Sequence, residues 1–270
     1  MNFKDFELII FDLDGTLVDS AEDIMIANNN TLVKFGYKPI NFKNVKHIIG
    51  QGIRVNIIRS LKMQNVKVSK KKENEMYNYF FSFYKKNLYV KSKIYVGLIS
   101  FLKKLKKRNY KLAVCSNKLE ELTKKVLKKT ELFKYFDFIA GGDTFAHRKP
   151  HPSVLNDVIK EFKINKDKTL FIGDSEHDYH SALNSNIKFC LKTKGFTNKP
   201  ESFFKKSFKI KKNKALFIGD SEHDYYSALN SNIKFCLKTK GFTNKPTSFF
   251  KKSFKIKNYT DKNMDLKSHG

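Results

Sequence analysis

The hydrophobic pattern of the chain changes twice along its length. Residues 6–11 form a short apolar run, which predicts a buried strand. From residue 19 to about 90, apolar side chains recur at helical spacing, and Gly50-Gln51-Gly52 interrupts the pattern near its middle. From Gly97 onward, short apolar strands alternate with amphipathic helices. The chain therefore begins with a strand, continues as a mostly helical region and then becomes an alternating one.

The alternating region predicts an α/β fold. Helices are expected at 98–107, 119–129 and 153–162, and strands at 110–116, 136–140, 170–172 and 187–191. Strands that alternate with helices form a parallel sheet with right-handed crossovers. Ligands of such sheets bind beyond the carboxyl ends of the strands. The polar clusters of this chain follow strand ends, so a site is expected along that edge.

A long internal repeat occupies most of the C-terminal part of the chain. Residues 168–212 recur at 214–258 with a constant offset of 46, and only four of the 45 paired positions differ. A solenoid needs several stacked units, so two copies indicate a tandem duplication of one βαβ segment. Each copy carries Gly-Asp-Ser-Glu-His-Asp, beginning at Gly173 and at Gly219.

Composition favours a globular protein of the reducing cytosol. With 270 residues and 40% apolar content, the chain is long enough for a real core. No apolar run reaches the roughly 18–20 residues that span a bilayer, and no secretory signal is visible at the N-terminus. Cys115, Cys190 and Cys236 lack the spacing of metal ligands, which predicts free thiols.

The formal net charge of +28 raises the question of nucleic-acid binding. Only four of the 54 basic residues are arginine, the residue that recognises bases and phosphates with a planar fork. The lysines are spread along the whole chain. We therefore expect no specific nucleic-acid partner and no membrane partner, although the positive field can attract small phosphorylated anions.

Two carboxylates follow the first strand. Asp12 and Asp14 are two positions apart and precede Gly15 and Thr16. Residues i and i+2 of a strand share a face, so both carboxylates can reach one spot, where they can hold a divalent cation and one can attack an electrophile. The alternative is a plain Asp-Gly turn.

Further polar groups follow the later strands. They are Ser116 with Asn117, Lys149 in a Lys-Pro-His-Pro turn, and Asp174 with Asp178. Each has a structural alternative: Ser116 and Asn117 can cap a helix, the lysine is one of many, and the two acids suit a helix start.

Together these groups fit phosphoryl transfer. Magnesium prefers a few hard oxygen ligands, and phosphoryl transfer depends on positioning and charge neutralisation. A carboxylate nucleophile can split hydrolysis into two steps, helped by a neighbouring acid. We expect His151, His177 and His223 not to be metal ligands, because oxygen-rich surroundings suit magnesium rather than zinc.

In this order, the motifs resemble those of the haloacid dehalogenase-like phosphatase superfamily, and within it the phosphoglycolate phosphatase group. The resemblance runs from about Phe6 to Lys192. The segments that carry it are 12–20, 114–118, 141–143, 149–152 and 171–175. It implies a Rossmann-like core with a small all-helical cap inserted after the first strand.

The resemblance also implies roles for the residues. Asp12 would be the nucleophile and Asp14 the general acid/base. Asp12, the Asp14 main-chain carbonyl and Asp174 would bind Mg²⁺, and Asp178 would orient Lys149 or a metal-bound water. The residues implied in holding the phosphoryl group and substrate are Ser116, Lys149, Gly15, Thr16 and Asn117. Because the dehalogenating members lack the second acid, Asp14 favours phosphate ester hydrolysis.

Three domains are predicted from this comparison. Residues 1–18 and 93–212 would form the core, 19–92 the helical cap, and 213–270 the near-identical duplicate with a tail. The cap would close over the site and select the substrate. Arg54, next to the glycine-rich break, is predicted to bind a substrate carboxylate; the alternative is an exposed arginine at a helix start.

The duplication leaves two candidates for the third carboxylate. The stretch from Lys149 to Asp174 holds one helix and one strand, whereas Asp220 would require the first copy to loop out. Loop-closure entropy favours the short route by roughly 1 kcal/mol, and the first copy emerges first during synthesis. We therefore predict that Asp174 completes the site. The spare copy is expected to extend the sheet edge, to pair with another chain or to stay poorly packed.

The sequence thus predicts a cytoplasmic, Mg²⁺-dependent phosphatase acting on a small phosphorylated metabolite, with phosphoglycolate as the leading substrate. Rival enzymes with the same core are a nucleotidase, a sugar-phosphate phosphatase and a phosphoglucomutase. Rivals of another class are a catalytically impaired protein and a basic binding protein.

Overall fold

A computed structural model describes residues 5–192, 195–196, 215–219 and 234–237. Its centre is a seven-stranded sheet in the order β5-β4-β1-β6-β7-β8-β9, and every neighbouring pair is parallel. The strands are β1 (Leu8–Phe11), β4 (Lys111–Cys115), β5 (Phe138–Ala140), β6 (Thr169–Gly173), β7 (Lys188–Lys192), β8 (Ala215–Gly219) and β9 (Lys234–Leu237). The predicted α/β fold with a parallel sheet is confirmed.

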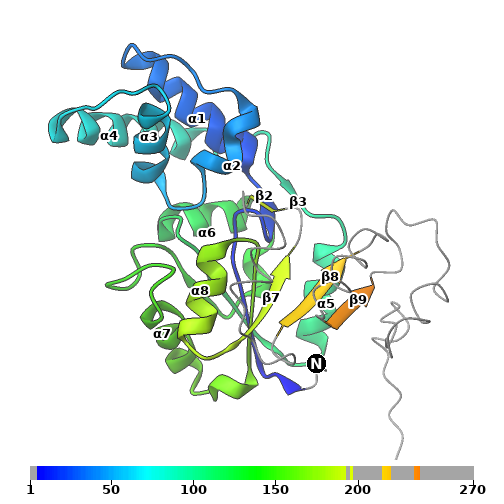
Figure 1. Cartoon of the computed structure of the whole chain (residues 1–270). Helices are drawn as coiled ribbons and strands as arrows, with labels where there is room; N and C mark the ends of the chain where they lie inside the picture. Colours follow the sequence, from blue (N-terminus) through cyan, green and yellow to red (C-terminus); the bar gives the residue numbers. More distant parts are fainter. Residues whose placement is uncertain (1–4, 193–194, 197–214, 220–233, 238–270) are drawn as a thin grey trace, which may run out of the picture.

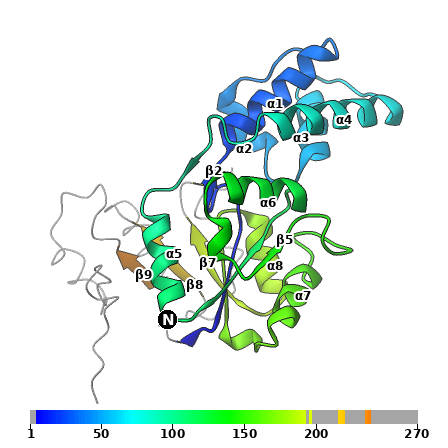
Figure 2. The ribbon, with the colours of Figure 1, turned by 180° about the vertical axis from the view of Figure 1, so that it is seen from behind.

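Helices cover both faces of this sheet (Figures 1 and 2). They are α5 (Leu98–Lys107), α6 (Glu120–Lys129), α7 (Ser153–Phe162) and α8 (Glu176–Asn184), with short 3₁₀ turns at Phe133–Tyr135 and Lys166–Lys168. Alternate residues of β1 point to opposite faces: Ile9 and Phe11 share a core with α5 and α6, while Leu8 and Ile10 share one with α7 and α8. This two-sided burial explains why β1 is apolar throughout.

The helical region lies over the carboxyl edge of the sheet (Figure 1). It contains α1 (Ala21–Lys34), a 3₁₀ turn (Phe42–Asn44), α2 (Val45–Ile48), α3 (Ile53–Lys62) and α4 (Lys70–Lys86). The chain enters it through β2 (Val18–Asp19) and leaves through β3 (Lys93–Ile94), and these two strands pair antiparallel. The predicted glycine break falls between α2 and α3. The exact domain boundaries remain a prediction.

A buried carboxylate fastens the return from the helical region. Asp23 in α1 accepts hydrogen bonds from the backbone N–H groups of Val90, Lys91 and Ser92 at 3.0, 2.8 and 2.9 Å, and it also contacts the Ser92 hydroxyl. Burying a charge is costly unless it is hydrogen-bonded, and these bonds meet that need. They hold the chain after α4 against the start of α1.

The structure describes two strands of the second repeat copy, β8 and β9, and both extend the sheet beyond β7. β8 pairs with β7 and β9 pairs with β8, and Gly219 faces Leu237 as Gly173 faces Leu191. The segment between β8 and β9, with Asp220, lies outside the described residues. Within the described chain, Cys115 and Cys190 are buried free thiols, and no helix has the length and apolar character needed to cross a membrane.

Candidate active site

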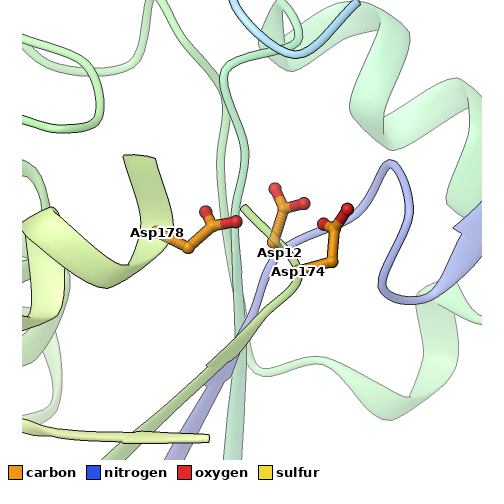
Figure 3. A group of neighbouring side chains, drawn as sticks. All are labelled: Asp12, Asp174 and Asp178. Atoms are coloured by element: carbon orange, nitrogen blue, oxygen red, sulfur yellow. The ribbon is translucent and has the colours of Figure 1, made fainter. Parts of the chain in front are cut away.

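Three buried carboxylates meet at the carboxyl edge of the sheet. Asp12 directly follows β1, Asp174 directly follows β6, and Asp178 lies in the first turn of α8. One carboxylate oxygen of each lies within 4.8 Å of the others, and Figure 3 shows the three side chains converging. Because β1 and β6 are neighbouring parallel strands, residues that directly follow them are brought side by side. The trio is a set of hard oxygen ligands of the kind that Mg²⁺ prefers.

Lys149 brings a positive charge to this trio. Its Nζ atom donates to Asp12 Oδ1 and Asp178 Oδ1, each at 2.6 Å, and to the Cys115 carbonyl oxygen at 2.8 Å. The lysine is buried, so burial alone would lower its pKa, but the two carboxylates outweigh that effect and raise the pKa. Lys149 therefore stays protonated and can also hold a phosphoryl oxygen.

Burial shapes the pKa values of the carboxyl groups. Desolvation raises the pKa of Asp12 well above its usual range despite the nearby Lys149, and Asp178 and Asp174 add repulsion. Desolvation, with repulsion from Asp178, raises the pKa of Asp174 to about 7. A divalent cation would relieve this repulsion, because it favours the ionised carboxylates. The donor set thus fits a divalent metal.

Asp174 is held by the loop that follows β1 and by a backbone N–H group after β7. Thr16 donates from Oγ1 to Asp174 Oδ1 at 3.0 Å, and the Phe196 backbone N–H donates to Oδ2 at 2.5 Å. Gly15 has a φ of +92°, and a Cβ atom there would lie 2.3 Å from the Asp174 carboxylate, so this position requires glycine. Gly15 and Thr16 therefore contact a carboxylate of the trio, and their predicted contact with substrate remains a prediction.

Asp178 caps the start of α8 and also binds Lys149. Its Oδ2 accepts from the backbone N–H and the hydroxyl of Ser175 at 3.0 and 2.6 Å, while Ser175 Oγ accepts from the Asp178 N–H at 3.3 Å. This is a capping box at the start of α8. The helix-start interpretation of Asp178 is therefore correct, and the same carboxyl group still binds Lys149 through Oδ1.

The Asp14 side chain points to a second, separate network. Its Oδ2 forms an ion pair with Lys118 Nζ at 3.0 Å, and its Oδ1 accepts from the Ser20 hydroxyl. Lys118 is buried and also donates to the Tyr84 hydroxyl of α4 at 2.9 Å. Desolvation outweighs the attraction of Lys118 and raises the pKa of Tyr84 to about 12. This network connects the helical region to the predicted acid/base.

Ser116 and Asn117, the pair predicted after β4, line a cavity together with Asp12 and Lys149. Ser116 is buried, and its Oγ accepts from the Lys118 backbone N–H at 3.2 Å. Asn117 donates from Nδ2 to the Lys149 carbonyl at 3.1 Å, and its Oδ1 is buried with no hydrogen-bond partner in the described chain. The helix-cap alternative is wrong for both residues, because α6 starts at Glu120 and its N-cap is Leu119.

A cavity of about 210 Å³ lies between the helical region and the sheet edge. The predicted site residues that line it are Asp12, Asp14, Arg54, Ser116, Asn117, Lys149, Asp174 and Asp178. The Arg54 guanidinium is already engaged, with Glu73 Oε1 at 2.9 Å and Asn74 Oδ1 at 2.8 Å, and it lies over the Tyr77 ring. Its contact with a substrate carboxylate remains a prediction.

Lys118, Tyr84 and Ser20 are site contacts that sequence reasoning missed. Tyr84 belongs to an apolar stripe and is buried, so its spacing predicts a core residue and gives no sign of a polar role. Lys118 directly follows Ser116 and Asn117, and that proximity was the available signal. His177 contacts Gln51 of the helical region through its ring nitrogen, and in the described chain it is outside the carboxylate trio.

Three comparisons with known proteins, by family model, by sequence and by structure, agree on one family. The sequence model described as haloacid dehalogenase-like hydrolase matches residues 9–192. A phosphoglycolate phosphatase of Aquifex aeolicus is 38% identical over 189 residues, covering 70% of this chain and 85% of that protein. One from Agrobacterium fabrum is 35% identical over 193 residues, covering 72% and 83%. The crystal structure of a predicted phosphoglycolate phosphatase from Haemophilus somnus aligns with a TM-score of 0.69 at 28% identity, covering 73% of this chain and 89% of that one.

Proposed function

The chain belongs to the haloacid dehalogenase-like hydrolases and is a phosphoric monoester hydrolase, and we propose that its substrate is phosphoglycolate and that it depends on Mg²⁺. One observation carries the proposal: three buried carboxylates meet at the carboxyl edge of the sheet, and one buried lysine pairs with two of them. The names of its relatives support the choice of substrate.

In the proposed reaction Asp12 is the nucleophile. One Asp12 carboxylate oxygen forms a bond to phosphorus while the bond from phosphorus to the ester oxygen breaks. Asp14 gives its proton to the departing ester oxygen. Water then attacks phosphorus, Asp14 takes the water proton, and the bond to Asp12 breaks, releasing phosphate and restoring both acids.

The other residues position the phosphoryl group. Lys149 and Ser116 hold its oxygens, with Asn117 nearby, and they stabilise the charge that spreads over them in the transition state. Asp178 fixes Lys149 through the 2.6 Å contact. Asp12, Asp174 and the Asp14 main-chain carbonyl would hold Mg²⁺, which when bound neutralises negative charge between the carboxylates and the phosphate.

The helical region supplies the lid in this proposal. It forms part of the cavity, and its Tyr84 and Gln51 contact Lys118 and His177 below. Closure over a small cavity excludes water and favours a short substrate.

The proposal is tested by replacing the nucleophile. Asp12→Asn should lower kcat for phosphoglycolate by about a thousandfold or more, since amides do not form the acyl phosphate. Asp167→Asn, an exposed residue outside the cavity, is the matched control and should retain full activity. EDTA should abolish turnover and Mg²⁺ should restore it.

The outcomes separate the rivals. Turnover of sugar phosphates or nucleotides in preference to phosphoglycolate would make the substrate wrong while leaving a phosphatase. Full activity of Asp12→Asn would contradict the proposed nucleophile. A wild-type protein that hydrolyses neither phosphoglycolate nor sugar phosphates nor nucleotides would favour the impaired or binding-protein alternative.

A further inference from the structure

Six lysine and arginine side chains of the described chain line the cavity: Lys46, Arg54, Arg59, Lys118, Arg148 and Lys149. A substrate that carries a carboxylate besides its phosphate binds more strongly when each group has a cationic partner. The cation that binds the substrate carboxylate should be one whose charge is not already paired within the protein. The contacts of the six side chains show which of them are paired.

Four of the six are already engaged by the protein. Lys149 pairs with Asp12 and Asp178, and Lys118 pairs with Asp14 at 3.0 Å. The other two are arginines of α3: Arg54 pairs with Glu73 at 2.9 Å, and Arg59 donates to the carbonyls of Ile48 and Ile49 at 3.3 and 3.4 Å. Because Lys70 and Arg54 both donate to it, the pKa of Glu73 is lowered, so it stays ionised beside Arg54.

Arg148 differs from these four. Its guanidinium forms no hydrogen bond or ion pair with any residue in the described part of the chain. Its Nη1 lies 3.5 Å from the position that a Cβ atom on Gly52 would occupy, and the Asn117 carbonyl oxygen lies 3.5 Å from the same position. The arginine thus stands where the loop between α2 and α3 meets the core.

The position of Arg148 limits the substrate. It precedes Lys149 directly, so their Cα atoms are about 3.8 Å apart, and Lys149 reaches Asp12. Arg148 and Asp12 also line the same cavity of about 210 Å³, so a group held by Arg148 and a phosphoryl group at Asp12 would share that small space. Lys46 is also unpaired in the described chain, but a guanidinium matches both oxygens of a carboxylate, whereas an ammonium acts as a hydrated point charge.

We propose that Arg148 binds the carboxylate of the substrate, and so selects short phosphate monoesters that carry a carboxylate close to the ester bond. This inference rests on the proposed function and names the residue that would distinguish phosphoglycolate from uncharged esters of similar size. It places the specificity on the core loop beside Lys149, and it leaves Arg54 as part of the ion pair with Glu73.

The test compares phosphoglycolate with ethyl phosphate, which has a similar length and lacks the carboxylate. In Arg148→Gln, kcat/KM for phosphoglycolate should fall about tenfold to a hundredfold, the range of a charged hydrogen-bonded contact, while kcat/KM for ethyl phosphate changes less than about threefold. Arg148→Lys should restore part of the loss. Arg108→Gln, an exposed arginine outside the cavity, is the matched control and should leave both values unchanged.

Arg54→Gln supplies the competing outcome. If the inference is correct, Arg54→Gln changes the ratio of kcat/KM for phosphoglycolate to kcat/KM for ethyl phosphate less than Arg148→Gln does. An unchanged ratio in Arg148→Gln, or a larger shift in Arg54→Gln, overturns the inference while the phosphatase assignment stands. A wild-type enzyme that hydrolyses ethyl phosphate but not phosphoglycolate overturns both the inference and the proposed substrate.

Discussion

Asp174 links burial, protonation and metal binding within one carboxyl group. Burial and the neighbouring Asp178 raise its pKa to about 7, although Thr16 and Phe196 donate hydrogen bonds to it. An unfolded aspartic acid has a pKa of about 3.9. Between these values the folded protein holds a proton that the unfolded chain releases, so without metal the stability contributed by this group falls as pH rises from about 4 to 7.

Added Mg²⁺ should reverse that loss. We expect a larger increase in melting temperature from Mg²⁺ at pH 8 than at pH 5.5, because the metal must displace protons from the carboxyl groups at the lower pH. Thermal unfolding with Mg²⁺ and with EDTA at both pH values measures this. Asp174→Asn, which removes the carboxylate, should show a small shift at both. Equal shifts in the wild type at the two pH values would contradict the expectation.

Some contacts of the candidate active site could be predicted from the sequence and others could not. Asp12 and Asp174 directly follow neighbouring parallel strands, and the order of those strands brings them together. Lys149 begins a proline-containing turn and contacts Asp12. The ion pair of Asp14 with Lys118, and the bond of Lys118 to Tyr84, depend on how the helical region sits on the core. Hydrophobic spacing cannot reveal that placement, because an aromatic residue at a core position has the same pattern with or without a bonded hydroxyl.

The Asp23 carboxylate connects the first helix of the helical region to the segment that leaves it. Asp23→Ala should destabilise the protein by about 3 kcal/mol, because buried backbone N–H groups of residues 90–92 lose a charged acceptor. Chemical denaturation followed by circular dichroism measures the free energy of unfolding. Glu22→Ala, an exposed neighbour in the same turn of α1, should change it by less than about 0.5 kcal/mol. Equal effects of both variants would show that the clamp contributes little.

The elements themselves were largely predictable from periodicity. The predicted helix at 153–162 coincides with α7, and the strand expected at 110–116 contains β4. The pairing of β2 with β3 was not predicted, since two-residue strands carry no period. The role of Asp23 was also hidden, because an acid in the first turn of a helix already suits the helix dipole.

At the scale of the whole molecule, the repeat places two nearly identical strands in one sheet. β6 lies directly beside β1, whereas β8 is separated from β1 by β6 and β7. Neighbouring strands are about 4.8 Å apart, so β8 runs roughly 14 Å from β1. Asp220 follows β8 in sequence and itself lies outside the described residues. This sheet order supports assigning the third carboxylate to Asp174.

Matched substitutions in the two copies test this assignment. Asp174→Asn should lower kcat severely, by about a hundredfold or more if a metal ligand is lost, while Asp220→Asn should change it less than about twofold. The measurement is kcat for phosphoglycolate at saturating Mg²⁺, with metal affinity determined for each variant. Equal losses, or a loss confined to Asp220→Asn, would show that the second copy forms the site.

Deletion of residues 212–257 asks whether the molecule needs its second copy at all. The deletion removes β8 and β9 from the edge of the sheet and leaves β1, β6 and the carboxylate trio in place, so activity should be retained or improved. If the sheet edge at β9 supports self-association, as edge strands can, the deleted protein should also contain fewer chains per particle, measured by light scattering at equal concentration as the ratio of the particle mass to the mass of one chain. An inactive but folded deletion protein would mean that the duplicated strands are required to hold β6 and β7 in the arrangement that brings Asp174 to Asp12.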